Sequence, residues 1–253
     1  MIIMKKLLKI FWNGIKKPFS SVNNSFFGLL IFAPIPYIYF LTGFLGMGYL
    51  LRVGEYSINK KQDLPEWKDF LNIFKIGIKG WLIVFFYFIP LSLILFLIFL
   101  LSSFKISFPS ISQNIIPNVV NYFNEMRLIL GMFSYLFIAM IGLLYLFTLY
   151  LFPVALLRFA KNQKFSTAFK LKDIISASFS MEYFVSWFIL EIVPLIYAAI
   201  IFIFSIKFLD IIIPTNYKYA YIVLFYFLVG LKQYFLGILS YTVYGTILRE
   251  KLK

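Results

Sequence analysis

The 253-residue sequence contains neither cysteine nor histidine. Their absence excludes disulfides, thiolate chemistry, and haem or zinc sites of the usual kind, so we expect no metal and no cofactor. Carboxylates are also few, since 10 Asp and Glu stand against 24 Lys and Arg. A nucleophile would need a lysine or a carboxylate as its base, and the carboxylates lie mostly in polar connections. The sequence therefore favours a protein that is not an enzyme.

Charge of either sign is scarce. Only 13% of the residues are charged and 62% are hydrophobic, with a mean hydropathy of +0.90, whereas about a quarter of an average globular chain is charged. The apolar residues form five blocks, each long enough for the roughly 20 helical residues that cross a bilayer. The blocks span 25–51, 80–103, 128–157, 185–206 and 219–247. We predict an all-α, polytopic integral membrane protein with about five to six membrane helices.

The basic residues predict which connections face the cytoplasm. A net charge of +14 would suggest nucleic-acid binding in a soluble protein, but beside membrane segments such charges face anionic headgroups. Connections 52–79 and 158–184 and the tail 249–253 are basic, whereas 104–126 carries only Lys105. We therefore predict a multi-pass cell-membrane protein with a cytoplasmic C-terminus. Its expected partner is anionic lipid and not nucleic acid, and an unidentified protein partner stays open.

The N-terminal segment 1–24 predicts an amphipathic helix in the membrane interface, ahead of a single membrane domain over 25–253. One helical face is apolar and the other is basic. The apolar face comprises Leu7, Leu8, Phe11, Trp12 and Ile15, and the basic face comprises Lys5, Lys9 and Lys16. The lysines of this segment favour a cytoplasmic N-terminus.

The first apolar block, 25–51, conflicts with that orientation if it crosses the membrane once. Five single crossings with a cytoplasmic tail would place the basic N-terminus outside. Pro34 and Pro36 each remove a backbone donor within the block and disfavour a continuous helix. A re-entrant hairpin that enters and leaves from the cytoplasmic side resolves the conflict, and a kinked single span is the alternative.

An internal parallel repeat is visible in the spacing of a few residues. Trp81 and Trp187 are 106 positions apart, as are Arg52 and Arg158. A Leu-Leu-Arg or Ile-Leu-Arg sequence ends at each of these arginines and again at Arg249. The repeat covers roughly 25–103 and 128–206, with a truncated copy over 219–249. Coincidence in a biased composition is the alternative.

The first connection contains signals for a helix start. Asp63, Pro65 and Glu66 have the spacing of a capping box, with Asp63 as the cap. A helix that lies on the membrane surface would then follow, and 165–176 shows a weaker version of the same pattern. The predicted apolar face of the helix that follows Asp63 comprises Trp67, Phe70, Leu71, Phe74 and Ile78.

Several motifs, taken in order, resemble those of an uncharacterised family. They are Gly48–Arg52, Asp63–Trp67, Phe74–Gly80, Phe152–Arg158, Phe165–Phe169 and Tyr244-Gly245. The order is similar to that of domain-of-unknown-function family number 4013, which comprises multi-pass membrane proteins found mainly in methanogenic archaea. The most specific part is the first-loop motif with Gly48, Arg52, Asp63, Pro65 and Trp67. The resemblance implies an integral membrane protein of about this size and implies no activity.

Two charges inside apolar blocks, Glu191 and Lys232, form a candidate intramembrane polar site. A structural pair, snorkelling or a wet interior face is the alternative explanation for these two charges. The arginines at 52, 158 and 249 are expected at cytoplasmic helix exits, where they would contact headgroups or helix-end carbonyls, or serve only as topology anchors.

Three classes of function remain for such a chain. The first is a non-enzymatic membrane protein that organises lipid, envelope or partner proteins, and it draws on the basic exits and amphipathic segments. The second is a transporter or channel-like protein that uses Glu191 and Lys232. The third is a membrane-embedded enzyme that acts on lipid. A polar cavity reaching either charge would favour transport, and a dry interior would favour organisation.

Overall fold

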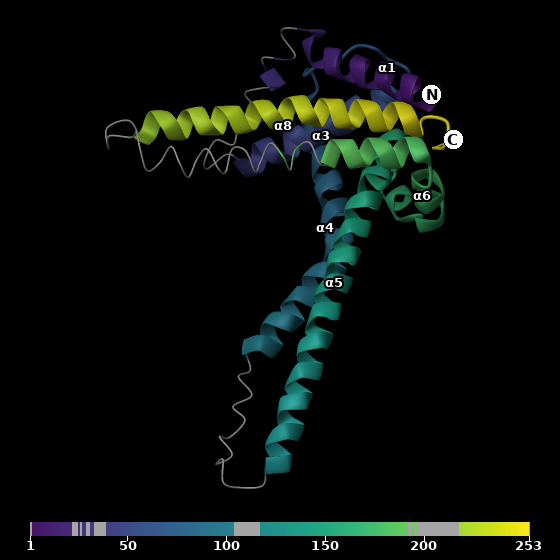
Figure 1. Cartoon of the computed structure of the whole chain (residues 1–253). Coiled ribbons are helices and arrows are strands. Elements are labelled where there is room, and N and C mark those ends of the chain that lie inside the picture. Colours follow the sequence, from purple (N-terminus) through teal and green to yellow (C-terminus); the bar gives the residue numbers. More distant parts are fainter. Residues whose placement is uncertain are drawn as a thin grey trace. The chain divides into compact units, whose positions relative to one another are not determined.

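The computed structural model describes residues 2–21, 25, 27–28, 31–32, 39–103, 117–191, 194, 196 and 218–252, and its regular structure there is entirely helical (Figure 1). The longer helices are α1 (Ile2–Lys16), α3 (Tyr39–Ile58), α4 (Phe70–Ser103), α5 (Pro117–Asn162), α6 (Leu171–Ser178) and α8 (Lys218–Leu248). Two short 3-10 helices are η1 (Lys17–Phe19) and η2 (Phe165–Phe169), and residues 181–191 are also helical. The prediction of an all-α fold is confirmed for these residues.

The chain forms two compact units. The first joins Met1–Val84 to Leu151–Lys253, and the second is Phe85–Tyr150. Within the first unit, α8 packs against both α3 and α1, and the two chain ends lie at the same end of α8 (Figure 1). Every candidate site residue discussed below belongs to this first unit.

Within the part of the chain that the structure describes, two helical stretches are long and apolar enough to cross a membrane. They are Phe70–Phe96 in α4 and Ala139–Asn162 in α5, with mean hydropathies of 2.0 and 2.2. The core helix of a soluble protein would be mostly buried, yet only 17% of the apolar window in the first stretch is buried. These stretches support membrane association. The predicted blocks 25–51 and 185–206, with Pro34 and Pro36, lie partly outside the described residues.

The predicted capping box at Asp63–Glu66 is wrong. Residues 60–69 form a connection without helix, and α4 begins at Phe70. The helix is capped by Asp69, whose Oδ1 accepts a hydrogen bond of 3.3 Å from the backbone N–H of Asn72. Glu66 instead pairs with Lys68 at 2.6 Å on the surface. Proline and carboxylate spacing alone did not distinguish two candidate caps six residues apart.

The buried face of α4 also differs from the predicted one. Phe70 is exposed and Leu71 is 76% exposed. The face that packs inward carries smaller residues at helical spacing, namely Ile73, Ile76, Gly77, Gly80 and Ile83. The large apolar residues therefore point away from the helix contact, as expected where the surrounding medium is lipid and close helix packing needs small residues.

Glycines let α3 touch α4 and α8 backbone to backbone. A Cβ added to Gly48 of α3 would overlap the carbonyl oxygen of Ile73 in α4, and one added to Gly77 would overlap the carbonyl oxygen of Phe44. On another face of α3, a Cβ at Gly245 of α8 would lie 2.7 Å from the carbonyl oxygen of Gly54. Such direct contacts require residues without a side chain at the crossing points.

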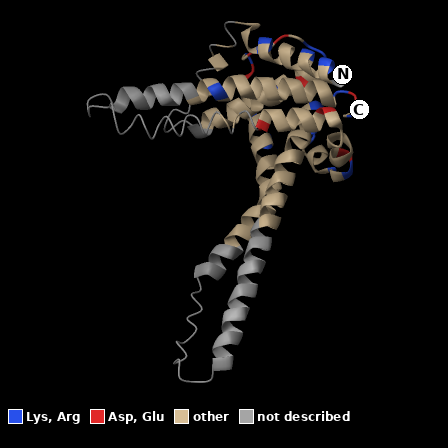
Figure 2. Ribbon diagram, viewed as in Figure 1, with Lys and Arg blue, Asp and Glu red and all other residues tan. Residues whose placement is uncertain are grey.

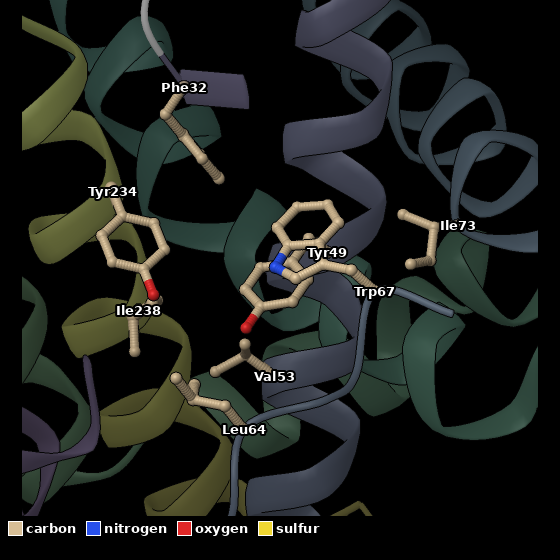
Figure 3. Close-up of a cluster of buried hydrophobic side chains, with 8 residues drawn as sticks. All are labelled: Phe32, Tyr49, Val53, Leu64, Trp67, Ile73, Tyr234 and Ile238. Carbon is tan, nitrogen blue, oxygen red and sulfur yellow. The ribbon is translucent and has the colours of Figure 1, made fainter. Parts of the chain in front are cut away.

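A stacked pair of aromatic side chains packs the connection between α3 and α4 against α3 (Figure 3). The rings of Tyr49 and Trp67 are stacked with centroids 3.9 Å apart and planes inclined by 3°. Both side chains are buried, together with Phe32, Tyr234 and Ile238, in one cluster that draws on α3, α8 and the connection. Trp67 thus belongs to the core and not to the exposed face of a surface helix.

The helix α1 packs on α8 through one edge of its predicted apolar face. Leu7 is buried, and a Cβ at Gly14 would lie 2.7 Å from Leu239 Cδ1 of α8. The rest of that face, including Leu8 and Trp12, remains exposed. The apolar face of α1 therefore has two parts. One edge is buried against α8, and a broader strip is exposed.

Two of the three predicted arginine exits are not helix ends. α3 continues past Arg52 to Ile58, and α5 continues past Arg158 to Asn162. Only Arg249 follows directly on the end of its helix, α8, at Leu248. Hydropathy marks where the apolar block stops, whereas these helices extend beyond it by one turn or more.

We predict that Gly48→Ala destabilises the protein by about 3 kcal/mol or more, because the added methyl group would push α3 off the α4 backbone. Gly43→Ala is the matched control on the same helix, since nothing lies within 4 Å of a Cβ there. That variant should be neutral or slightly stabilising through helix propensity. Thermal unfolding midpoints of the detergent-purified variants test this prediction, and equal midpoints for the two would contradict the close crossing.

Candidate functional site

The two predicted intramembrane charges, Glu191 and Lys232, line one open cavity of about 460 Å³. The walls come from α3, α8, the helical residues 181–191, and the parts of α4 and α5 that belong to the first unit. Most of the wall is apolar, with Phe32, Leu50 and Leu236 among its members. Glu191 and Lys232 are 41 residues apart in the sequence, yet they contribute opposite charges to the same largely apolar cavity.

Polar groups near this cavity are held in place by hydrogen bonds. Trp81 Nε1 donates to the carbonyl oxygen of Gly43 at 3.2 Å, and the Tyr241 hydroxyl donates to Met47 Sδ at 3.7 Å. Both contacts join α3 to another helix. The cavity therefore has a defined wall in which the carboxylate and the ammonium group can hold the polar part of a ligand.

The three predicted arginines make different contacts. Arg249 donates from Nη2 to the carbonyl oxygen of Ser57 at 2.6 Å and from Nε to that of Ile58 at 3.1 Å, so it satisfies carbonyls at the C-terminus of α3. Arg158 donates to Asp173 at 2.8 Å. Arg52 lies 4.0 Å from Asp69.

The last two contacts are related by the predicted repeat. In both contacts, an arginine near the end of a long helix pairs with an aspartate at the start of a later helix. Asp69 precedes α4, and Asp173 lies in the first turn of α6. The internal repeat itself stays a prediction.

A second cavity, of about 510 Å³, lies where η1, the ends of α3 and α8, and the connection after α3 meet. We call it the cationic pocket. All twelve of its lining residues are polar. They are Asn13, Lys16, Lys17, Ser20, Ser57, Lys60, Lys61, Gln62, Asp63, Thr242, Thr246 and Arg249. Figure 2 shows the Lys and Arg residues gathered along α1 and at the end of the unit where the chain termini lie.

Lys17 is the buried cation of the cationic pocket, with 6% of its surface exposed. Its Nζ donates to Ser57 Oγ at 3.0 Å and to the carbonyl oxygen of Lys61 at 3.4 Å. Burial lowers the pKa of Lys17 to about 8; Asp63 opposes this shift and Arg249 adds to it. The pocket thus contains an ammonium group that is solvated by neutral oxygens and lacks a directly bonded carboxylate.

Sequence reasoning did not single out Lys17, Ser57, Lys60 or Lys61. Lysine pairs at 16–17 and 60–61 were visible, but each is ordinary beside a membrane segment. Only the packing of α1, α3 and α8 brings them together with Arg249. Among the described residues there is no group of three or more carboxylates that could hold a metal ion.

The residues of the first-loop motif support the helix crossing and the cationic pocket. Gly48 forms the contact with α4, and Trp67 stacks on Tyr49. Pro65 is buried in the connection, and Asp63 is the carboxylate of the cationic pocket. The motif therefore has a structural reading at each of these positions.

The comparison with known proteins identifies the same family that this motif resembles. The family described as "Protein of unknown function (DUF4013)" matches residues 29–206, and the chain belongs to that family. The matched region contains α3, α4, α5 and α6, whereas α1 and α8 lie largely outside it. No curated protein and no solved structure matches the chain.

We predict that Lys17→Met stabilises the protein below pH 8, where the buried ammonium group is charged in both the folded and the unfolded state. The folded pKa is about 8 and the unfolded value is 10.5, so burial of the charge costs on the order of 3 kcal/mol at pH 7. Between pH 8 and 10.5 the unfolded state binds more protons, so the stability of the wild type rises and the advantage of the variant disappears.

Unfolding midpoints of the wild type and Lys17→Met at pH 7 and pH 10 measure this difference. Lys16→Met, at an exposed neighbour, controls for the loss of one positive charge. A difference between the wild type and Lys17→Met that does not change with pH would contradict the burial of a charged Lys17.

Proposed function

We propose that this protein is a non-enzymatic, multi-pass membrane protein that binds and organises lipid, with five to six membrane segments and both termini on the cytoplasmic side. The observation that carries the proposal is the cavity that joins Glu191 and Lys232. Its volume of about 460 Å³ falls within the range of roughly 300–1,000 Å³ that is typical of small-molecule sites.

The character of the cavity wall favours an amphipathic ligand. A hydrated ion would meet a wall with few polar groups to replace its water, whereas an acyl chain or the glycerol region of a lipid would bury apolar surface there. Glu191 and Lys232 would then meet the charged groups of a headgroup, since a charge in an apolar setting is stabilised by a nearby opposite charge.

The helix α1 supports a role at the membrane surface. Its exposed strip, which includes Met4, Leu8 and Trp12, is suited to insertion at the level of the headgroups. Lys5 and Lys9 are exposed on the same helix and would attract anionic lipid, each contributing about 1 kcal/mol near the surface. A surface-bound α1 that is also packed on α8 would couple the membrane interface to the helices around the cavity.

Transport is the second candidate, because one cavity receives both intramembrane charges. A transporter would move its substrate past Glu191 and Lys232, and this movement is measurable as flux into proteoliposomes. Lipid binding without flux favours the organising role, and flux that is lost in Glu191→Gln favours transport.

We predict that Glu191→Gln and Lys232→Met each reduce the amount of lipid that stays bound to the purified protein by about tenfold, because each removes a hydrogen bond to a charged group. Native mass spectrometry of the protein extracted from its membrane measures the retained lipid. Glu250→Gln and Lys164→Met are the matched controls, since both residues are exposed and neither lines the cavity. Unchanged retention in the cavity variants would contradict the proposal.

The absence of native cysteine allows a direct test of the proposed orientation. We predict that single cysteines introduced at Lys5 and at Lys251 react with an impermeant maleimide only after the cells are permeabilised. A cysteine at position 110, in the connection predicted to lie outside, should react in intact cells. Labelling of position 5 from outside would contradict the re-entrant arrangement of 25–51 and favour the kinked span.

A further inference from the structure

The cationic pocket gathers the C-terminal ends of three helices. α1 ends at Lys16, α3 at Ile58 and α8 at Leu248, and residues at or next to each end line the pocket. Helix C-termini carry partial negative charge, so some of the cations here are explained as partners of the helix dipoles. The helix dipoles would explain all of the cations only if the charge of the helix ends equalled that of the cations.

The charges do not balance. Five cations line the pocket together with a single carboxylate, Asp63, which leaves a formal excess of four positive charges. Three helix ends supply about half a negative charge each, so roughly 2.5 positive charges remain uncompensated. An anion with one negative charge would neutralise part of this excess, and an anion with two would neutralise most of it.

The cations also lack carboxylate partners. Among the described residues, none of Lys16, Lys17, Lys60, Lys61 and Arg249 forms an ion pair within 4.0 Å, whereas Lys6, Lys68, Arg52 and Arg158 do. The contacts that the pocket cations do make are with neutral groups. Lys61 Nζ lies 4.6 Å from the centroid of the Tyr56 ring, and Arg249 and Lys17 donate to carbonyl and hydroxyl oxygens.

The backbone at Lys60 is a second, independent feature of this site. Lys60 has a φ of 62°, and the backbone N–H groups of Lys60 and Lys61 donate to the carbonyls of Ser57 and Tyr56. This is the C-terminal cap that glycine usually provides, and a lysine there costs about 1 kcal/mol relative to glycine. A charged residue thus occupies a position where backbone conformation alone favours glycine.

We propose that the cationic pocket binds a phosphate-bearing anion, either a phosphomonoester or a phosphodiester. Lysine ammonium groups act as point charges suited to phosphate oxygens, and the polar and charged side chains of the lining can solvate an anion that an apolar cavity would reject. The pocket lies next to the exposed apolar strip of α1, so a lipid headgroup and a soluble phosphate ester are both able to supply the anion. This site is separate from the cavity at Glu191 and Lys232, and it stands whether or not that cavity binds lipid.

A pair of double variants tests the proposal. Lys60→Gly with Lys61→Gln removes two charges from the pocket, and the glycine relieves the backbone conformation, so this protein should fold at least as well as the wild type. Lys164→Gln with Lys172→Gln removes the same number of charges from exposed positions that do not line the pocket. Unfolding midpoints without added anion verify the fold of both.

Binding is measured with two probes on the full-length protein. In detergent, inorganic phosphate and glycerol phosphate are titrated calorimetrically. In nanodiscs of phosphatidylcholine, the unfolding midpoint is compared with and without phosphatidic acid. The pocket double variant should weaken the response by about tenfold or more, because two charged hydrogen-bond donors are lost, while the control double variant should change it less than about twofold.

The outcomes separate the sources and the alternatives. Responses in both arms support recognition of the phosphate group itself, and a response in nanodiscs alone, lost in the pocket variant, supports a lipid-borne phosphate. Equal losses in the two double variants would overturn the proposal in favour of non-specific surface charge. The absence of a response in both arms for the wild type would overturn it as well.

Discussion

The first unit depends on the direct contact of the α3 backbone with the backbones of α4 and α8. Gly48 and Gly77 make one crossing, and Gly54 and Gly245 make the other. Between apolar helices in lipid, burial of apolar surface gives little driving force, so close van der Waals packing has to supply it. Two crossings on one helix fix its position relative to both neighbours, and the stack of Trp67 on Tyr49 closes the connection over the first of them.

Both candidate sites follow from that arrangement. The first site is the largely apolar cavity that α3 and α8 help to form, and Glu191 and Lys232 line it. The second site is the cationic pocket, which is lined by polar residues and forms where the end of α3 meets the ends of α1 and α8. The burial of Lys17 costs stability, and the lysine conformation at 60 adds a smaller cost. A bound anion would offset both, since it would interact favourably with the charges that the fold brings together.

Part of this could be predicted from the sequence. Long, continuous hydrophobic blocks predicted an all-α protein, and the block 219–247 agrees closely with α8 at Lys218–Leu248. The first-loop motif identified the family. Helix ends were less predictable, because hydropathy follows the apolar stretch while α3 runs on beyond Arg52 to Ile58. The capping box at Asp63 was predicted from residue spacing alone, whereas α4 begins at Phe70 with Asp69 as its cap.

The cationic pocket was beyond sequence reasoning because its cations come from positions near 17, 60 and 249, and each has a sufficient local explanation as a topology anchor. The convergence of the three helix ends is the central claim, and spin labels in the cysteine-free chain measure it directly. Paired labels at positions 16 and 60, 60 and 246, and 16 and 246 should each show dipolar broadening in the folded protein. Broadening absent from any pair would mean that the helix ends do not meet, and the pocket would not exist as described.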